Sequence, residues 1–269
     1  MSVYKNENSE YFKQAMDSMI NQTLRPSEIV LIEDGPLTDS LYEAIEKYKN
    51  EHPNLFVIIK NKENIGLGLS LNKGIACCTY DYIARMDTDD ISEIDRCEKQ
   101  MEILLQKNID VVGSNITEYD YTMSKVVGFR DLPEKNFDIH QYLKKRCPFN
   151  HQSVMFRKEA VLNAGNYQHY LYNEDYFLWI KMSLNNCKFY NIQDSLVKVR
   201  TSPNLYARRG GLKYYKSEKQ IQKFMYQKKL IGYFQYKKAC FIRFIVQVIM
   251  TKKMRSFFYS KFLRRKKKC

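Results

Sequence analysis

The chain has 269 residues and a formal net charge of +14, and this length can bury one large core or two modest ones. It contains no apolar run of about 18 residues and no charged-then-apolar leader, so a membrane-spanning or secreted protein is not expected. Seven cysteines and four histidines indicate reduced thiols and argue against a disulfide framework or a zinc site.

Charge is distributed unevenly along the sequence. Residues 205–269 contain 20 Lys or Arg and one acidic residue, whereas residues 1–204 have a small negative net charge. The sequence therefore predicts a folded domain over 1–204 and a basic, aromatic-rich helical tail over 205–269. Such an asymmetry indicates a polyanionic partner for the tail, either a membrane surface or nucleic acid.

Strand and helix patterns alternate along the first 200 residues, which is typical of an α/β domain. Apolar runs and helical spacing predict strands over 28–32, 55–59, 82–86 and 109–114, and helices over 41–48, over 67–75, from near Ser92 and from 173. We expect a central, mostly parallel, twisted sheet flanked by helices. Ligands of such a sheet collect at the carboxyl ends of its strands.

Three carboxylates crowd the turn that follows the strand predicted over 82–86, namely Asp87, Asp89 and Asp90. Close carboxylates repel one another unless a cation lies among them. Mg²⁺ and Mn²⁺ take oxygen ligands, usually carboxylates together with substrate phosphates. The Asp-x-Asp pattern therefore predicts a metal-diphosphate site. The alternative is an acidic first turn of the helix expected from near Ser92.

A second carboxylate pair, Glu174 and Asp175, opens the helix predicted from 173. Helix capping is one explanation of these residues. If the helix start faces the ligand edge of the sheet, Asp175 is also placed to accept the proton of a substrate hydroxyl. Near the first strand end, Tyr4 is suited to stacking on a flat base.

Six motifs in this order resemble those of family 2 glycosyltransferases, in particular enzymes of bacterial capsule and exopolysaccharide biosynthesis. They lie at 1–7, 22–35, 64–74, 84–90, 151–158 and 173–179. Ordered motifs over roughly residues 1 to 200 are far more specific than any one of them. The resemblance implies a nucleotide-sugar-binding domain of the GT-A type and an inverting transfer that needs Mg²⁺ or Mn²⁺.

The resemblance also implies roles for residues that bind the donor, with a UDP-sugar favoured. These residues are Tyr4, Asp34, Asn72, Arg85, Asp87 and Asp89. Tyr4 matches the residue that stacks on the base, and Asp34 matches the acid that reads the base edge. Asp87 and Asp89 match the pair that binds the ribose and the metal-diphosphate, with both as metal ligands.

On the acceptor side, Asp175 matches the general base and Glu174 lies beside it as an orienting carboxylate. His151 occupies a motif position near the acceptor or metal, and a purely structural histidine is the alternative. The expected acceptor is a glycan or a lipid-linked glycan of a cell-surface polysaccharide. The resemblance implies a clipped first strand, because family members usually have several apolar residues ahead of this motif and here Met1 stands directly ahead of Ser2, Val3 and Tyr4. A catalytically impaired, nucleotide-sugar-binding remnant is therefore an alternative to an active enzyme.

The tail contains the apolar segment 239–250, which is too short to span a bilayer. Its helical apolar face is Phe241, Phe244, Ile245, Val248 and Ile249, and further aromatic residues precede the basic run 264–268. Basic charge beside an apolar face supplies two signals for attachment to an anionic membrane surface. We therefore expect a cytoplasmic protein attached peripherally to the inner face of the cell membrane. A helical layer packed on the catalytic domain is the alternative, and nucleic-acid binding is disfavoured because no recognition motif accompanies the basic residues.

Overall fold

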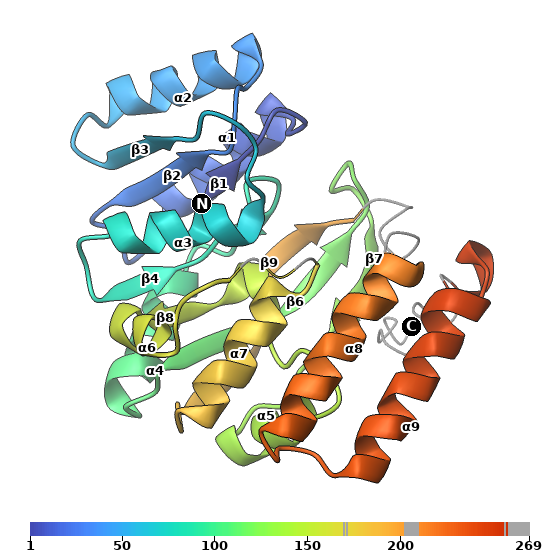
Figure 1. Ribbon diagram of the computed structural model, residues 1–269. Coiled ribbons are helices and arrows are strands. Elements are labelled where there is room, and N and C mark those ends of the chain that lie inside the picture. The colour runs from blue at the N-terminus through green and yellow to red at the C-terminus, as the bar shows by residue number, and fades with distance from the viewer. Residues whose placement is uncertain (169, 171, 202–209, 256, 258–269) are drawn as a thin grey trace.

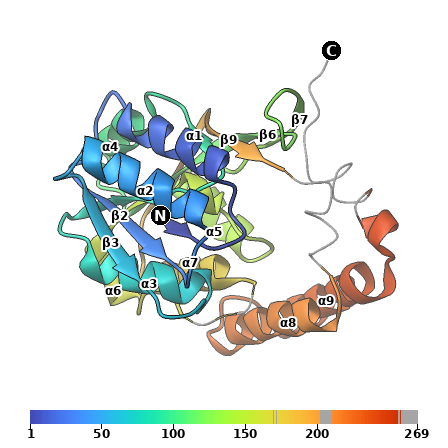
Figure 2. The same cartoon turned by 90° about the horizontal axis from the view of Figure 1, so that it is seen from above.

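The structure is a computed structural model that describes residues 1–168, 170, 172–201, 210–255 and 257. Its strands form two sheets, which lie next to each other with helices on their faces (Figure 1). Two long helices, α8 and α9, run side by side at one edge of the molecule (Figure 2).

The first sheet is parallel and has the order β1-β2-β3, with β1 at Ser2–Val3, β2 at Ile29–Glu33 and β3 at Phe56–Lys60. Helices α1 (Ser9–Ile20) and α2 (Asp39–Glu51) cover one face, and α3 (Leu67–Cys77) lies on the other (Figure 2). Every residue of β2 is buried, because helices cover both faces of the sheet. A strand in this position needs a continuous apolar run, which the sequence has.

The second sheet has the strand order β4-β8-β6-β9-β5, and β7 pairs with the outer part of β6. Its strands are β4 (Tyr82–Ala84), β5 (Ile91–Ser92), β6 (Val111–Tyr119), β7 (Val126–Arg130), β8 (Met155–Arg157) and β9 (Phe189–Arg200). Strands β6 and β9 are parallel, and the other pairs in this sheet are antiparallel. The parallel arrangement expected from the sequence therefore holds for the first sheet, while the second is mixed.

The helix expected from near Ser92 begins later, and that expectation was wrong. Residues 91 and 92 form β5, which pairs with Lys198 and Val197 of β9. Helix α4 starts at Arg96 and ends at Gln106. The backbone groups of Ile91 and Ser92 form hydrogen bonds with β9 and therefore do not form the first turn of a helix. Asp87, Asp89 and Asp90 lie ahead of β5 and not in a first helical turn.

The largest core lies around Trp179 of α7 (Glu174–Leu184), which is fully buried. Phe149 and Phe156 contact its ring, with centroids 5.2 and 6.5 Å away. The shorter helices α5 (Asn136–Leu143) and α6 (Lys158–Asn163) pack against α7. This packing fixes the amino end of α7, where the second carboxylate pair is located.

Helix α8 (Leu212–Gln227) is packed against the domain, because its Ile221 and Met225 belong to the same core as Trp179. Arg243 of α9 (Tyr233–Phe244) forms an ion pair with Glu218 of α8 at 2.6 Å. A π-helical turn at Ile245–Ile249 follows. Phe262, Leu263 and the basic run 264–268 lie outside the described residues. Within the described part of the chain, no helix is both long enough and apolar enough to cross a bilayer.

Candidate active site

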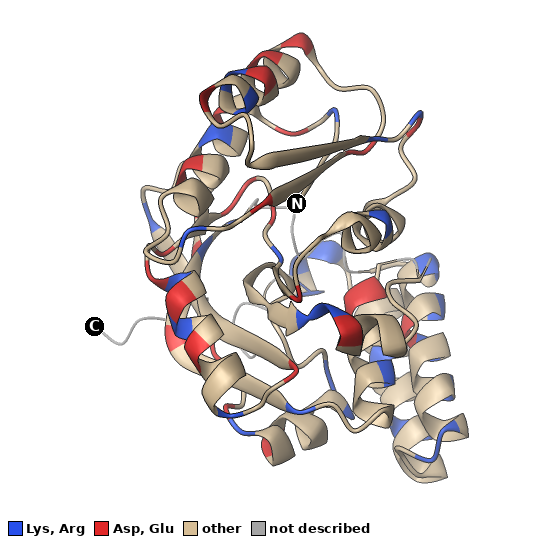
Figure 3. Cartoon of the chain, turned by 90° about the vertical axis from the view of Figure 1, so that its left-hand side faces the viewer, with Lys and Arg blue, Asp and Glu red and all other residues tan. Residues whose placement is uncertain are grey.

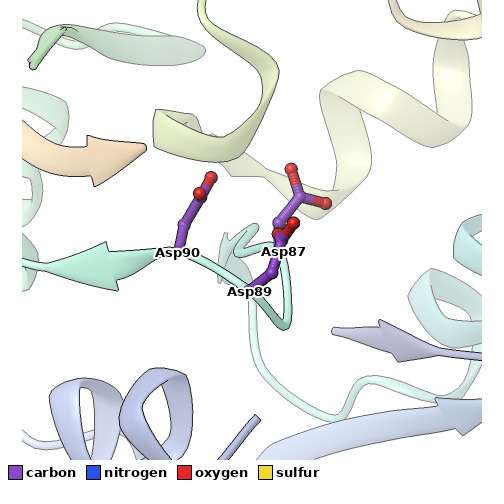
Figure 4. Close-up of side chains that lie close together, drawn as sticks. All are labelled: Asp87, Asp89 and Asp90. Carbon is purple, nitrogen blue, oxygen red and sulfur yellow. The ribbon is translucent and has the colours of Figure 1, made fainter. Parts of the chain in front are cut away.

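The segment between β4 and β5 carries Asp87, Asp89 and Asp90, whose carboxylates point to the same side (Figure 4). One oxygen from each lies within 4.8 Å of the others. The short strands on either side fix this segment, because β4 pairs with β8 and β5 pairs with β9. The chain therefore gathers three carboxylates at the end of β4, where the sequence places them.

Asp87 is held by Arg85, which donates to both carboxylate oxygens at 2.6 and 2.5 Å. The Arg85 side chain is only 4% exposed, and a bidentate pair of this kind fixes the carboxylate geometry. Beneath it, the buried guanidinium of Arg96 donates to the main-chain oxygens of Arg85 and Val154 at 2.6 and 3.3 Å. These contacts fix the orientation of Asp87 before any ligand binds.

Asp89 and Asp90 differ in their surroundings. Asp90 is buried and accepts a hydrogen bond from the backbone N–H of Arg200 at 2.8 Å. Burial, followed by repulsion from Asp89 and Asp87, raises the pKa of Asp90 well above its usual value. Burial also raises the pKa of Asp89 to about 7, and the charges of Asp87 and Glu7 add to this shift. The Asp90 hydrogen bond therefore joins the loop to β9. Asp89 is the carboxylate that would lose its proton when a cation binds.

Tyr4 and Asp34 follow the ends of β1 and β2, next to the segment 85–90 between β4 and β5, called the Asp loop. Tyr4 is 41% exposed. Thr88 of the Asp loop donates to the main-chain oxygen of Ser2 at 3.3 Å, which joins this loop to β1. The Asp34 carboxylate accepts hydrogen bonds from the Asn61 side chain at 3.1 Å and from the N–H groups of Ile65 and Gly66 at 2.9 and 3.1 Å. Asp34 therefore shapes the loop that leads into α3.

Glu174 and Asp175 form the first turn of α7. Burial raises the pKa of Glu174 to about 7, and the charge of Asp175 adds to the shift. The Cys147 thiol donates to an Asp175 oxygen, with the sulfur 3.3 Å away. Burial and the charge of Asp175 raise the pKa of that thiol well above its usual value, so Cys147 stays a neutral donor. A carboxylate held by one weak donor keeps lone pairs for a substrate hydroxyl.

Tyr167 contacts two of the sequence-predicted residues, Asn72 and His151. Its main-chain oxygen accepts from the Asn72 side chain at 2.6 Å, and its hydroxyl lies 2.6 Å from Nε2 of His151. Burial, together with the charge of Arg85, lowers the pKa of His151 well below its usual value, so the imidazole is neutral. Burial raises the pKa of Tyr167; the charge of Arg85 opposes this shift, and the charges of Asp175 and Glu174 add to it. Asn72, His151, Arg85 and the carboxylate pair of α7 therefore lie around Tyr167.

Three contributors were not predicted from the sequence: Glu7, Tyr167 and Arg200. Glu7 accepts from the Thr88 hydroxyl at 2.9 Å, and burial raises its pKa. Its position three residues after Tyr4 was the available signal. Arg200 donates from Nε to the main-chain oxygen of Asp89 at 2.8 Å, but more than 100 positions separate them and the sequence gives no sign of this contact.

Residues 2–165 match the family model described as Glycosyl transferase family 2. This chain belongs to glycosyl transferase family 2. It is 37% identical to the amylovoran biosynthesis glycosyltransferase AmsE of Erwinia amylovora, over 97% of each chain. It is 32% identical to an Escherichia coli enzyme described as a UDP-Gal:alpha-D-GlcNAc-diphosphoundecaprenol beta-1,3-galactosyltransferase, over 98% of this chain and 95% of that one. The chain is a glycosyltransferase of bacterial polysaccharide biosynthesis.

Solved structures confirm the GT-A fold. S. aureus TarS 1-349 in complex with UDP-GlcNAc superposes with a TM-score of 0.67 at 13% identity, over 96% of this chain and 78% of that one. The chain spans 46% of the longer TarS chain. The mannosyltransferase PcManGT from Pyrobaculum calidifontis, in complex with GDP-Man and Mn2+, gives a TM-score of 0.62 at 12% identity, over 92% of this chain and 69% of that one.

Proposed function

We propose that this chain transfers a sugar from a UDP-sugar to a lipid-linked glycan acceptor, with inversion at the anomeric carbon and with Mg²⁺ or Mn²⁺ as the cofactor. The observation that carries the proposal is the Asp loop. Its carboxylates converge within 4.8 Å, and the pKa of Asp89 is raised to about 7 by burial and by neighbouring acids. Three converging carboxylates with a raised pKa at Asp89 suit a divalent cation, whose charge would offset their mutual repulsion.

Asp89 would hold the cation together with Asp87, which Arg85 orients. When bound, the ion would supply positive charge against the leaving nucleoside diphosphate. Tyr4 would stack on the base, with the loop shaped by Asp34 closing the pocket around it. Asn72 and Arg85 complete the donor side. TarS was solved with UDP and PcManGT with GDP-Man and Mn2+, which supports a nucleotide-sugar donor and a divalent cation for this fold.

Asp175 would accept the proton of the acceptor hydroxyl as its oxygen attacks the anomeric carbon. A single displacement from the face opposite the leaving group inverts that centre. Cys147 holds one Asp175 oxygen through its thiol, and the second oxygen is available for the acceptor. Glu174 would orient the acceptor, and neutral His151 would lie beside it. General-base catalysis of this kind contributes on the order of 10² to 10⁴-fold.

The acceptor assignment draws on the E. coli relative, whose description names a diphosphoundecaprenol acceptor. A lipid-linked acceptor requires access to a membrane surface, and the C-terminal helices offer a matching face. Phe234 and Phe241 of α9 are 87% and 65% exposed. Exposed lysines lie on both helices, whereas the helices of the first sheet carry mixed charge (Figure 3). We propose that α9 and the π-helical turn lie on an anionic membrane surface.

The proposal is tested by incubating the purified chain with a panel of UDP-sugars and undecaprenyl-diphosphate-linked sugars, with Mn²⁺ or with a chelator. Transfer in Mn²⁺ that stops with the chelator is the expected result. Binding of UDP-sugars without transfer to any acceptor in the panel would favour a remnant that binds nucleotide-sugars. Transfer that continues in the chelator would refute the assignment of the Asp loop.

A further inference from the structure

The amino end of α7 is held by helix α8, which lies between α7 and α9 (Figure 1). Asn173 is buried and donates from its side chain to the Ser217 hydroxyl of α8 at 2.9 Å. The rings of Phe177 and Phe224 meet edge to face, with centroids 4.9 Å apart. Because Asn173 directly precedes the turn that carries Asp175, the position of α8 sets where this turn begins.

The segment 145–147, which follows α5, holds the side chain of Asp175 from another direction. The Cys147 thiol donates to one Asp175 oxygen, with the sulfur 3.3 Å away. The main-chain oxygen of Lys145 accepts in turn from Arg243 of α9 at 2.8 Å. A shift of this segment would therefore move the donor that orients the Asp175 carboxylate.

Arg243 connects both of these supports. Its Nε donates to Glu218 of α8 at 2.6 Å, and Glu218 is the sequence neighbour of Ser217. A second nitrogen of the same guanidinium donates to Lys145. A planar guanidinium offers donors in fixed directions, which a lysine ammonium does not. One side chain of α9 therefore bonds to the helix that holds the start of α7 and to the segment that holds the Asp175 carboxylate.

Packing of the helix pair does not explain why this ion pair is kept. The rings of Tyr226 and Tyr236 stack between α8 and α9 with centroids 5.5 Å apart, and Tyr215 meets Phe244 edge to face at 5.4 Å. The Arg243 side chain is 15% exposed and that of its partner 13%. A largely buried ion pair is often no more stabilising than apolar side chains of similar volume. Its particular contribution here is the directed contact with the segment 145–147.

We propose that Arg243 is a positioning residue for Asp175, through which helix α9 fixes the acceptor side of the active site. This inference rests on the proposed role of Asp175 as the base. A displacement of about 1 Å at a reacting group lowers the rate by about 100-fold, so small movements of Cys147 and of the start of α7 affect transfer. Helix α9 also carries Phe234 and Phe241 of the proposed membrane face. The helix that would approach a lipid-linked acceptor therefore also holds the base in place.

The test uses the full chain, three variants and one control. Arg243→Met removes both contacts of the guanidinium. Arg243→Met combined with Glu218→Met removes the same contacts without leaving a buried charge unpaired, and it serves as the test if the single variant does not fold. Glu218→Gln keeps the contact of Arg243 with the segment 145–147. The control is Arg157→Met, because Arg157 also donates to a main-chain oxygen, that of Ile109 at 3.2 Å, and pairs with Asp110 at 3.9 Å.

Three quantities are measured under conditions in which thermal unfolding shows each variant to be folded. They are the single-turnover transfer rate at saturating substrates, the affinity for UDP in Mn²⁺, and the rate at which iodoacetamide alkylates Cys147, resolved by peptide mass. Burial and the charge of Asp175 raise the pKa of this thiol, so alkylation is slow until the segment is released. Alkylation needs no substrate. If the parent chain transfers no sugar, the proposed function fails, and alkylation alone decides whether Arg243 holds the segment.

Both variants that lack Arg243 are expected to lower the transfer rate about tenfold or more, with UDP affinity within about twofold of the parent. They should also speed alkylation of Cys147 by about tenfold. Glu218→Gln should lose less transfer than either, and Arg157→Met should change none of the three quantities. An unchanged transfer rate in the variants that lack Arg243, or an unchanged alkylation rate, would overturn the proposal. A parallel loss of UDP affinity, or an equal loss of transfer in Arg157→Met, would overturn it too, because general destabilisation would explain both.

Discussion

Replacing Asp89 with Asn should raise the stability of the metal-free protein and lower the stability that Mn²⁺ and UDP add. The pKa of Asp89 is raised from 3.8 to about 7, mainly by burial and then by Asp87 and Glu7. Each pKa unit corresponds to about 1.36 kcal/mol, so an ionised Asp89 destabilises the metal-free fold by at most ~4 kcal/mol. The groups that repel Asp89, namely Asp87 and Glu7, also adjust their own ionisation. We therefore expect Asp89→Asn to regain about half of this destabilisation.

The sign of the pH dependence follows from the direction of the shift. A carboxyl whose pKa is higher in the folded than in the unfolded chain binds its proton more tightly when folded. Stability is then lost as the pH rises through the folded pKa. Asp89→Asn should therefore match the parent chain at pH 4 and exceed it at pH 8, where about 2 kcal/mol corresponds to roughly 4 to 8 °C in the unfolding midpoint.

The assay is thermal unfolding at pH 4 and pH 8 with a chelator, and at pH 8 with Mn²⁺ and UDP. A ligand at 100 times its dissociation constant stabilises the native state by about 2.7 kcal/mol, and Asp89→Asn should lose this gain. The control is Asp138→Asn on the exposed start of α5. It should change neither the stability at pH 8 nor the gain from Mn²⁺ and UDP. If Asp89→Asn keeps the gain from Mn²⁺ and UDP, or is no more stable than the parent at pH 8, the interpretation of the Asp loop is wrong.

Three further predictions concern the base, the membrane face and the loop scaffold. Asp175→Asn should retain UDP-sugar binding and lower the transfer rate by about 10² to 10⁴-fold, measured as single-turnover transfer; rates comparable to the parent would exclude Asp175 as the base. Phe234→Glu combined with Phe241→Glu should lower sedimentation with anionic vesicles at least tenfold. The exposed Phe137→Glu on α5, whose side chain is 70% exposed, is the control, and an equal loss in both variants would count against α9 as the membrane face. Arg96→Met should lower the free energy of unfolding by about 3 kcal/mol or more, because the main-chain oxygens of Arg85 and Val154 lose a buried donor. This free energy is measured by denaturant unfolding. A value within about 1 kcal/mol of the parent would contradict the prediction.

The sequence predicts most elements of the first sheet and its helices because their patterns are local. The run at 28–32 corresponds to β2, and the helical spacing over 67–75 corresponds to α3. Both elements pack through their own periodic apolar residues. The placement of Asp87 and Asp89 could also be predicted from the sequence, because their position at the end of a strand follows from the strand pattern alone.

Features that depend on contacts between distant residues could not be predicted from the sequence. Strand β5 exists because residues 91–92 pair with β9, about a hundred positions later, and its two residues show no strand pattern. The contact of Arg200 with the Asp loop has the same origin. The difference between buried Asp90 and ionisable Asp89 depends on packing around the loop, which the order of the residues does not reveal.

The anomeric configuration of the product tests the central proposal most directly. It is read by NMR after transfer from a UDP-α-sugar in Mn²⁺. One displacement assisted by Asp175, with the leaving diphosphate neutralised at Asp87 and Asp89, predicts a β-linked product and no product in the presence of a chelator. An α-linked product, or a β-linked product formed at an unchanged rate with the chelator, would contradict the proposed reaction.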